Sequence, residues 1–288
     1  MNYLQHDVPP PAERRRAQAL ATTRDWQIGQ FRAEPSSPLF SRSDVPGHLA
    51  IVFPRRCVGL FRGNTYQLAD ATKVVLHNPD SQYRRQPLDP AGDECFWYWL
   101  ADDLLDEIGT PRSVARPSPS GMRFERAELR CSRGHFRRER AIATRLLTEA
   151  PDPAELEEPL LGLLSEVLGK EGKDRCSRGA AADRIAQAAD DFLAAYFSEA
   201  PDLDRVARAV GISKFHLAHT YRRRRGRTVL EQRTELQLRA AYDRLLNGDR
   251  SVTEIAMELG FSSPSHFSTR FKQFFGTNPF SVHGGRRS

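Results

Sequence analysis

The densest group of charge in the sequence is an arginine run, Arg222 to Arg225 followed by Arg227. Five guanidinium groups within six residues can bind several phosphate oxygens, because each group presents a planar fork of N–H donors. A run of like charge is also compatible with an ordinary solvated surface. The run therefore predicts phosphate binding only where neighbouring elements hold it against a polyanion.

The charge balance favours a polyanionic partner for the C-terminal part of the chain. The 288 residues carry a formal net charge of +6. Residues 181–288 account for most of it, with 17 Lys and Arg against 12 Asp and Glu, whereas residues 1–180 have a net charge of only +1. Because a basic domain attracts nucleic acid over long range, the arginine run lies in the part of the chain best suited to such a partner.

Two segments of this basic part match each other in sequence: Leu203–Thr228 and Val252–Pro279. The alanines Ala207 and Ala256 align at an offset of 49, whereas Tyr221 and Phe271 align at an offset of 50. The second segment therefore contains one additional residue between these positions, and we expect its turn to be longer.

Each segment has the composition of a helix-turn-helix unit. A small alanine lets two helices cross closely, and Gly211 or Gly260 can adopt the left-handed conformation that ends the first helix. Ser213 or Ser262 can then cap the second helix, whose free N–H groups favour a phosphate. The segment between the units, Val229–Leu246, is predicted to be a helix that holds them apart.

The residues from 181 to 285 resemble the DNA-binding domain of the AraC/XylS family, over about a third of the chain. The resemblance rests mainly on Ser251–Val282, with its GF, FSTRFK and GTNP elements, and on the looser first unit. The sequence departs from the family pattern at Tyr221-Arg222, where Phe-Lys is usual, and at Gln237, where many members have arginine. Tyrosine keeps an aromatic anchor, so the same fold is expected.

The resemblance implies that the second helix of each unit enters a major groove, with the two insertions about one turn of duplex apart. Base contacts are then expected from Phe215, Ala218, His219, Pro264, Ser265 and Thr269. Phosphate contacts are expected from Ser213, Arg222, Arg223, Arg224, Arg225, Arg227 and Lys272, and secondary DNA contacts from Lys214, His216 and Gln273. The alternative role of each is a solvated helix face. Because the base-facing side chains are short or apolar, we expect methyl and shape contacts to dominate.

The N-terminal half contains short β-like runs separated by turn residues. The runs are His48–Phe53, Cys57–Phe61, Lys73–His77 and Cys95–Leu100, and the turns lie at Gly63-Asn64, Asn78-Pro79-Asp80 and Pro90–Asp93. This pattern predicts a small antiparallel barrel or sandwich, whose interior either holds a ligand or is filled by side chains. Trp97 and Trp99 alternate onto one face, where core packing is favoured over a ligand wall.

Two helices are predicted after the Pro- and Ser-rich stretch Gly109–Gly121. The first is Arg137–Glu149, and the second begins at a capping box of Asp152 and Glu155 and continues to Leu168. Five apolar residues form a stripe along the second helix: Leu156, Leu160, Leu163, Leu164 and Val167. Such a stripe packs either against its own domain or against another subunit.

These predictions divide an α+β chain into four parts. Residues 1–135 are expected to form a small cupin-like β-barrel with a sensing role, residues 136–170 a helical hairpin with a dimer contact, and residues 171–180 a linker. Residues 181–285 are expected to form an all-α domain of two helix-turn-helix units joined by a helix.

The cupin-like sensor and the dimer contact are implied by the family resemblance. So are the partners expected beside double-stranded DNA: a small-molecule effector, RNA polymerase and a second copy of the chain. The pattern of metal cupins, His-x-His with a spaced glutamate, is missing, so we expect no metal and no other cofactor. The operator, and whether binding activates or represses transcription, stay open.

The sequence also predicts a cytoplasmic protein. The longest apolar stretch, Cys95–Ala101, is far too short to cross a bilayer, and the N-terminus lacks an apolar signal core. We therefore expect neither a membrane partner nor export.

Two other classes of protein are compatible with parts of the sequence. An enzyme would use Cys57 or Cys95 as nucleophile, or the carboxylates Asp102, Asp103, Asp106 and Glu107. No GxSxG, HExxH, P-loop or dinucleotide-binding motif accompanies them, and the carboxylates suit a solvated helix start. A sequence-blind nucleic-acid-binding protein would also be basic, and competition between a specific site and random duplex separates it from a regulator.

Overall fold

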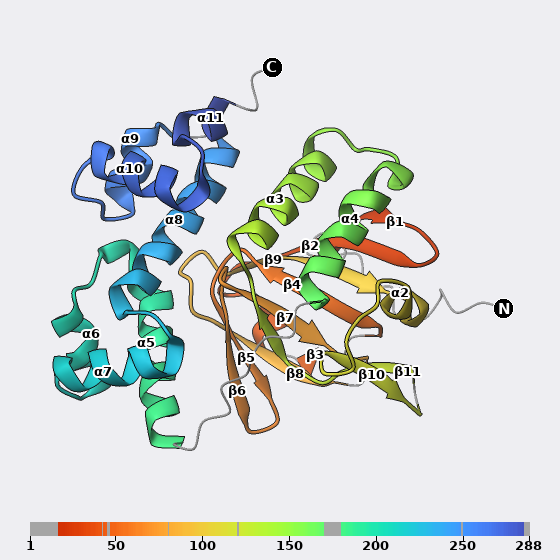
Figure 1. The fold of residues 1–288 in the computed structure, drawn as a ribbon, viewed down its shortest axis with the longest axis horizontal. Helices are drawn as coiled ribbons and strands as arrows, with labels where there is room; N and C mark the ends of the chain where they lie inside the picture. Colours follow the sequence, from red (N-terminus) through yellow and green to blue (C-terminus); the bar gives the residue numbers. More distant parts are fainter. Residues whose placement is uncertain are drawn as a thin grey trace. The chain divides into compact units, whose positions relative to one another are not determined.

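The chain forms two compact units, Met1–Gly172 and Lys173–Ser288, in a computed structural model. The residues that the structure describes are 17–41, 43–44, 47–79, 81–119, 121–169, 180–248 and 250–284. Within them the first unit combines sheets with helices, and the second contains helices only (Figure 1). The predicted linker, residues 171–180, lies outside the described residues except for Ala180, where a helix begins. Among the described helices, none has the length and apolar character needed to span a bilayer.

The larger sheet of the first unit is antiparallel, with the strand order β1-β2-β9-β4-β7-β12. Its strands are β1 (Ala17–Thr22), β2 (Trp26–Ala33), β9 (Asp93–Leu100), β4 (Leu49–Pro54), β7 (Lys73–His77) and β12 (Glu128–Arg130). Phe96 and Tyr98 of the central strand β9 are buried on one face. Trp97 and Trp99 share the opposite face, as predicted, with their ring centroids 4.6 Å apart. Trp97 packs against the buried cluster around Phe31, so the core-packing interpretation holds for it.

The smaller sheet has the order β3-β8-β5-β6. Among the described strands, β10 and β11 pair only with each other and form a separate hairpin. The strands are β3 (Ser43–Asp44), β8 (Tyr83–Pro87), β5 (Val58–Arg62) and β6 (Thr65–Ala69), and the hairpin strands are β10 (Ala115–Ser118) and β11 (Gly121–Phe124). The predicted turn at Gly63-Asn64 joins β5 to β6, and Gly63 has a φ of +56° there. No described strand of one sheet pairs with a strand of the other. The closed cupin-like barrel is therefore not confirmed, because the two antiparallel sheets stay open.

The predicted strands correspond to β4, β5, β7 and β9, and each turn keeps its place in so far as it is described. Asp80 of the second predicted turn lies outside the described residues. His77, at the end of β7, is buried beside Arg62, whose guanidinium lies 3.2 Å from its Nδ1 atom. Burial lowers the pKa of His77 well below its ordinary value, and the charges of Arg62 and Arg85 lower it further. The ring is thus neutral and structural.

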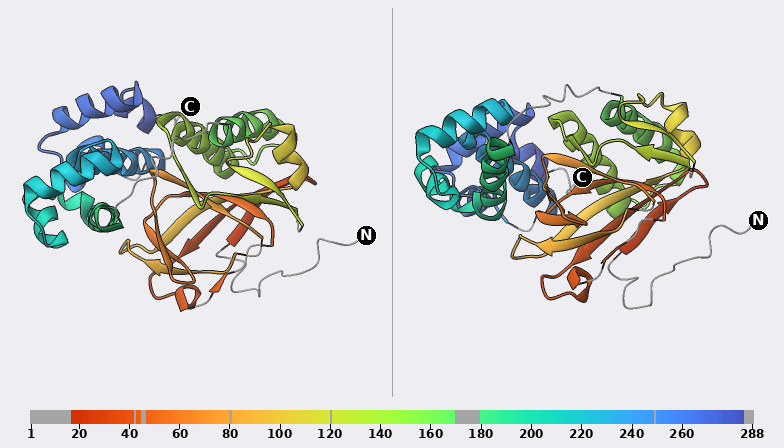
Figure 2. Two further views of the ribbon diagram at one scale, coloured as in Figure 1. Left: turned by 60° about the horizontal axis from the view of Figure 1, so that its bottom comes forward. Right: turned by 90° about the horizontal axis from the view of Figure 1, so that it is seen from below.

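Helices α3 (Arg133–Thr148) and α4 (Pro153–Leu168) cover one face of the larger sheet (Figures 1 and 2). A shorter helix, α2 (Asp102–Glu107), and a 3-10 helix, η1 (Pro38–Ser41), complete the unit. Glu139 of α3 is fully buried and accepts hydrogen bonds from the Tyr98 hydroxyl and from Arg55, each at 3.3 Å. This buried carboxylate fastens α3 to the sheet.

The starts of these two helices differ in detail from the predictions. Helix α3 begins four residues earlier than predicted, because Ser132 and His135 form a capping box at Arg133. Helix α4 begins as predicted, with the Asp152 side chain accepting from the N–H of Ala154. The predicted capping box with Glu155 is wrong, since Glu155 instead forms an ion pair with an arginine of α3.

The apolar stripe of α4 is buried within the first unit. All five of its residues are at most 3% exposed: Leu156, Leu160, Leu163, Leu164 and Val167. Of the two interpretations open from the sequence, packing against its own domain is confirmed. A contact between subunits through this stripe is excluded, because the stripe has no surface left to offer.

The second unit is a bundle of helices, and one buried apolar cluster joins α5, α6, α7 and the first half of α8. Its helices are α5 (Ala180–Tyr196), η2 (Phe197–Glu199), α6 (Leu203–Val210), α7 (Lys214–Arg225), α8 (Val229–Asn247), α9 (Val252–Glu258), α10 (Pro264–Phe275) and α11 (Pro279–Gly284). The long helix α8 is the predicted connector, one residue longer than expected. It begins at a capping box of Thr228 and Glu231 and ends at Gly248, which has a φ of +75°.

Candidate nucleic-acid interface

Helices α6 and α7 form the first predicted helix-turn-helix unit. Helix α6 ends at Gly211, whose φ of +78° is in the left-handed region, and the N–H of Ile212 returns to the carbonyl of Ala207 at 3.1 Å. The Ser213 hydroxyl caps α7 by accepting from the N–H of His216 at 3.3 Å. Leu217 is buried and anchors α7 inward. The predicted roles of glycine and serine in this turn are therefore confirmed.

The outer face of α7 presents most of the residues that the sequence assigns to DNA. Phe215 is 78% exposed, with the Lys214 ammonium 5.8 Å from the centre of its ring. His219 and Arg222 are exposed on the same helix, and Ala218 is half-buried. Lys214 is exposed and forms an ion pair with Asp204 at 3.2 Å. The spacing along α7 places four of these side chains on one face of the helix: Phe215, Ala218, His219 and Arg222.

The arginine run, in contrast, is divided between two environments. Arg222 and Arg223 are exposed. Arg224, Arg225 and Arg227 turn toward the protein, where their side chains are 7%, 27% and 17% exposed. Each of these three forms an ion pair with an acidic side chain of α5 or α8. The sequence suggested that all five arginines bind phosphate. In the structure two of them point outward, and the other three form ion pairs within the second compact unit.

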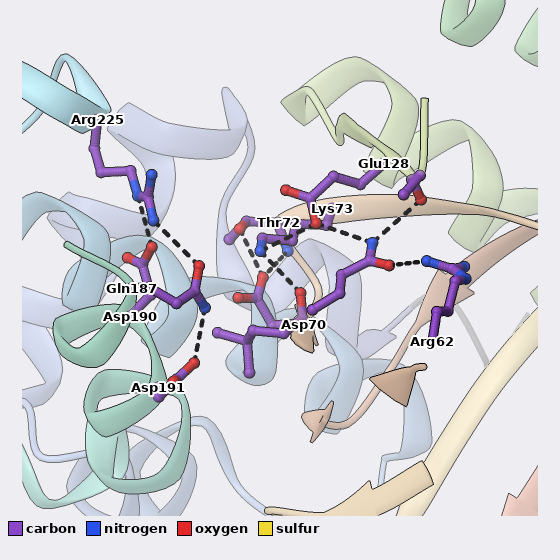
Figure 3. Close-up of polar contacts among 12 residues, drawn as sticks. Arg62, Asp70, Thr72, Lys73, Glu128, Gln187, Asp190, Asp191 and Arg225 are labelled. Carbon is purple, nitrogen blue, oxygen red and sulfur yellow. Dashed lines mark hydrogen bonds and ion pairs between the residues drawn. The ribbon is translucent and has the colours of Figure 1, made fainter. Parts of the chain in front are cut away.

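Asp190 and Gln187 of α5 both bind Arg225 (Figure 3). The carboxylate is buried, accepts from the Tyr221 hydroxyl, and accepts from Arg225 Nε at 2.6 Å. Arg225 also donates to Gln187 Oε1 at 3.3 Å, and Arg224 pairs with Asp183 at 3.3 Å. Burial, together with the neighbouring Asp190 carboxylate, raises the pKa of Tyr221 far above its ordinary value, so its hydroxyl stays a donor. Three acceptors spaced along α5 thereby fix α7 from behind.

These acceptors were not recognised in the sequence. Asp183, Gln187 and Asp190 lie four and three residues apart, so they share one helix face. That spacing, opposite a run of arginines, was the available signal. Glu235 of α8 plays the corresponding part for Arg227 and also pairs with Arg239, which is fully buried.

Helices α9 and α10 form the second unit, with a longer turn as predicted. Gly260 has a φ of +75°, and the N–H of Phe261 returns to the carbonyl of Ala256 at 3.0 Å. The cap of α10 is Ser263, which accepts from the N–H of His266 at 3.1 Å. The prediction of Ser262 as the cap is wrong, because the additional residue of the turn moves the helix start by one position. Ser262 contacts the His266 ring instead.

The outer face of α10 is polar. Ser265, Thr269, Lys272 and Gln273 are exposed, and Pro264 is half-buried at the first position of the helix. The inner face is aromatic, with buried rings at Phe267, Phe271 and Phe275. Arg270 is also exposed on this helix and was not among the predicted contacts, although it stands inside the FSTRFK element. It adds a positive charge beside Thr269.

The candidates for an enzyme active site do not come together. Cys57 and Cys95 are buried, and burial raises the pKa of the Cys95 thiol well above its ordinary value, which disfavours a thiolate nucleophile. Asp102 and Asp103 lie in the first turn of α2, and Asp102 accepts from the N–H of Met122 at 3.0 Å. In the described part of the chain, no three His, Cys, Asp or Glu side chains form a metal-binding group.

One family model and several known proteins match parts of the chain. The helix-turn-helix domain family model matches residues 206–282. The transcriptional regulator GlxA of Rhizobium meliloti is 37% identical over 117 residues, which are 38% of this chain and 36% of GlxA. The transcriptional activator RhaS of Escherichia coli is 32% identical over 95 residues, 33% of this chain and 34% of RhaS. The chain therefore spans about a third of the length of these relatives.

Two solved structures resemble the chain at a lower level. An AraC-type regulator from Chromobacterium violaceum is 25% identical, with a TM-score of 0.35, over 38% of this chain and 98% of that chain. ToxT from Vibrio cholerae is 14% identical, with a TM-score of 0.33, over 91% of this chain and 100% of that chain. These TM-scores are too low to establish a shared arrangement of the whole chain.

Proposed function

The chain belongs to the AraC/XylS family through its C-terminal helix-turn-helix domain, and we propose that it is a transcriptional regulator that binds specific sites on double-stranded DNA. One observation carries the proposal. Helices α7 and α10 each begin at a serine cap, each present an exposed outer face, and both are held by the single helix α8. Such a pair can enter successive major grooves on one side of a duplex.

In this proposal the outer faces read bases and the ends of the helices bind phosphates. Base contacts come from Phe215, Ala218, His219, Pro264, Ser265 and Thr269, with Lys214, His216 and Gln273 beside them. The exposed Phe215 ring suits a thymine methyl group, since both are apolar. Phosphate contacts come from Arg222, Arg223 and Lys272, and from the helix start at Ser213. Arg224, Arg225 and Arg227 support α7 from behind, because their charges are paired inside the unit.

The N-terminal compact unit, Met1–Gly172, has a sensing role in the same proposal. Residues 1–135 would bind a small-molecule effector, residues 136–170 would carry a helical hairpin, and the whole protein would act in the cytoplasm with RNA polymerase. A homodimer would use a surface other than the buried stripe of α4. No step in this proposal requires a cofactor or a catalytic residue.

Selection of duplexes from a random-sequence pool tests the proposal. The full chain is expected to enrich a discrete sequence and to bind it at least about a thousandfold more tightly than random duplex at physiological salt. A preference below about tenfold would instead support a sequence-blind nucleic-acid-binding protein. Replacing Phe215 with alanine should relax the preference at one position of the site while leaving binding to random duplex unchanged, because the ring carries no charge.

A further inference from the structure

The second helix-turn-helix unit touches the segment that leads into the first unit, in addition to their connection through α8. Gln237 lies in the middle of α8 and is only 2% exposed. Its Nε2 atom donates to the carbonyl of Phe197 at 3.2 Å and to the carbonyl of Leu259 at 2.7 Å. Phe197 lies between α5 and α6, just before the first helix-turn-helix unit, and Leu259 follows α9 in the second. One buried amide therefore holds the backbone that leads into the first unit and the backbone of the second.

A second contact closes the same junction. A Cβ atom on Gly260 would lie 2.7 Å from the Cβ of Ala200 and 2.8 Å from the carbonyl oxygen of Ser198. The turn of the second unit thus packs directly on the segment Phe197–Pro201, here called the corner. Arg233, one helical turn before Gln237, donates to the carbonyls of Ala200 at 3.2 Å and of Pro201 at 2.8 Å. The corner is fastened to α8 and also pressed against the second unit.

We propose that Gln237 is a positioning residue that fixes the separation between the recognition helices α7 and α10. The proposal rests on the proposed function, since a fixed separation matters only if both helices read one duplex. A buried amide that loses its acceptors is costly, so a shift of either unit that breaks these two hydrogen bonds is opposed. Helix α8 packs on the first helix-turn-helix unit through Val229 and Leu236 and on the second through Tyr242, whose ring stacks on Phe271. Apolar contacts of this kind tolerate small shifts, whereas the two hydrogen bonds of Gln237 require one fixed geometry.

The consequence is that the two halves of the DNA site are read at one spacing only. One inserted base pair moves the second half by about 3.4 Å and turns it by about 35° about the duplex axis. A rigid pair of helices cannot follow both changes, whereas a pair joined only by α8 can follow part of them. Gln237 thus determines spacing specificity without touching DNA.

The test uses the full chain and duplexes that the unaltered protein selects from a random pool. One or two base pairs are inserted into or deleted from the segment between the two half-sites. The unaltered protein is expected to lose about tenfold or more in affinity for each change of one base pair. Gln237→Leu keeps the volume but removes the donor, and it is expected to lose less than about threefold for the same change.

Gln232→Leu is the matched control. Gln232 lies on the same helix, is also 2% exposed, and its Oε1 atom has no hydrogen-bond partner among the described residues. This variant should keep the narrow spacing profile of the unaltered protein. If Gln237→Leu and the unaltered protein shared one profile, the inference would be overturned. If the unaltered protein preferred no duplex at all, the proposed function itself would fail.

A measurement on free protein keeps the inference testable if Gln237→Leu does not fold. Spin labels are placed by Arg223→Cys and Arg270→Cys, at exposed positions of α7 and α10, with Cys176 changed to serine. The other cysteines are buried. A single narrow distance distribution without DNA is expected. A broad distribution would overturn the fixed separation.

Discussion

Helix α7 is held by an apolar cluster together with a network of charged and hydroxyl groups, whereas the corresponding helix α10 is held mainly by aromatic rings. Tyr221 and Phe271 occupy matching positions in the two helices. The Tyr221 hydroxyl donates to the buried Asp190, which also binds Arg225. Phe271 instead lies between Phe267 and Phe275, with ring centroids 5.4 and 4.8 Å away. The two units thus share a buried apolar anchor, and the first adds a polar network that the second replaces with aromatic packing.

The difference shows that basic residues on a recognition helix need not face nucleic acid. The first helix-turn-helix unit has more arginine, yet three of its five clustered guanidiniums pair with carboxylates of the protein itself, two of which are buried. Buried ion pairs demand fixed geometry and are expensive to break, while apolar packing tolerates substitution by side chains of similar volume. The stability of the first helix-turn-helix unit should therefore be the more sensitive to loss of a single charge.

The largest loss of stability is expected from removing Phe271, the aromatic anchor of the second helix-turn-helix unit. Phe271→Ala should lower the free energy of unfolding by about 4 kcal/mol, because it leaves a cavity among packed rings, whereas Phe271→Leu should cost about 1 kcal/mol. Urea unfolding followed by far-ultraviolet circular dichroism measures the helical unit. All three tryptophans lie in the N-terminal compact unit, at positions 26, 97 and 99. Their fluorescence transition should not move, and a shared shift would contradict the assignment to one unit.

A slightly smaller effect is expected from removing the buried carboxylate behind α7. Asp190→Ala should cost about 3 kcal/mol, since Arg225 and the Tyr221 hydroxyl lose their common acceptor. Asp204→Ala is the control, because the exposed pair with Lys214 also reaches α7 and should contribute less than about 1 kcal/mol. The comparison between the two helices would be broken if both aspartates cost the same.

The division of the arginine run predicts two kinds of variant. Changing Arg222 and Arg223 together to alanine should weaken binding to all duplexes and reduce the slope of log affinity against log salt by about 1.8, because we propose that each contacts one phosphate. Arg225→Ala should lower the thermal stability of the second unit and leave that slope almost unchanged. Fluorescence anisotropy with labelled duplex over a series of salt concentrations measures the slope. Equal slopes for the two variants would contradict the division.

Alkaline pH should lower the stability of the first helix-turn-helix unit through the Tyr221 hydroxyl. The matching residue of the second unit, Phe271, has no such group. The folded pKa of Tyr221 is raised above the unfolded value of 10.0 by burial and by Asp190. Its contribution to stability is therefore complete below pH 10 and is lost as the pH rises further, by up to about 1.4 kcal/mol per pH unit. Tyr221→Phe removes this dependence. Unfolding of both proteins across this pH range should show their stabilities converging.

Several features of the second unit followed from the sequence because they depend on local chemistry. Glycines at 211 and 260 end helices in the left-handed conformation, and the offsets of 49 and 50 between the units give the longer second turn. The same offset of 50 aligns Ser213 with Ser263, so it contained the correct cap of α10. Two adjacent serines, Ser262 and Ser263, concealed it.

Other features depend on partners that are distant in the sequence. Asp190 and Arg225 are 35 residues apart, and neither charge indicates its partner. Strand β2 was missed because it is covered on both faces: Ile28 lies opposite Tyr98 and Phe31 opposite Cys95, which face different sides of the sheet. A strand of this kind does not keep one alternating apolar face. The role of Gln237 required the positions of two backbones that only the fold brings together.

The covered leucine stripe of α4 determines how stability depends on protein concentration. A unit whose folding required a second chain would unfold at a lower temperature on dilution, by mass action. Here the apolar surface of α4 is covered within one chain, so the stripe itself adds no concentration dependence to the melting temperature. A melting temperature that rises with protein concentration would therefore report association through a different surface.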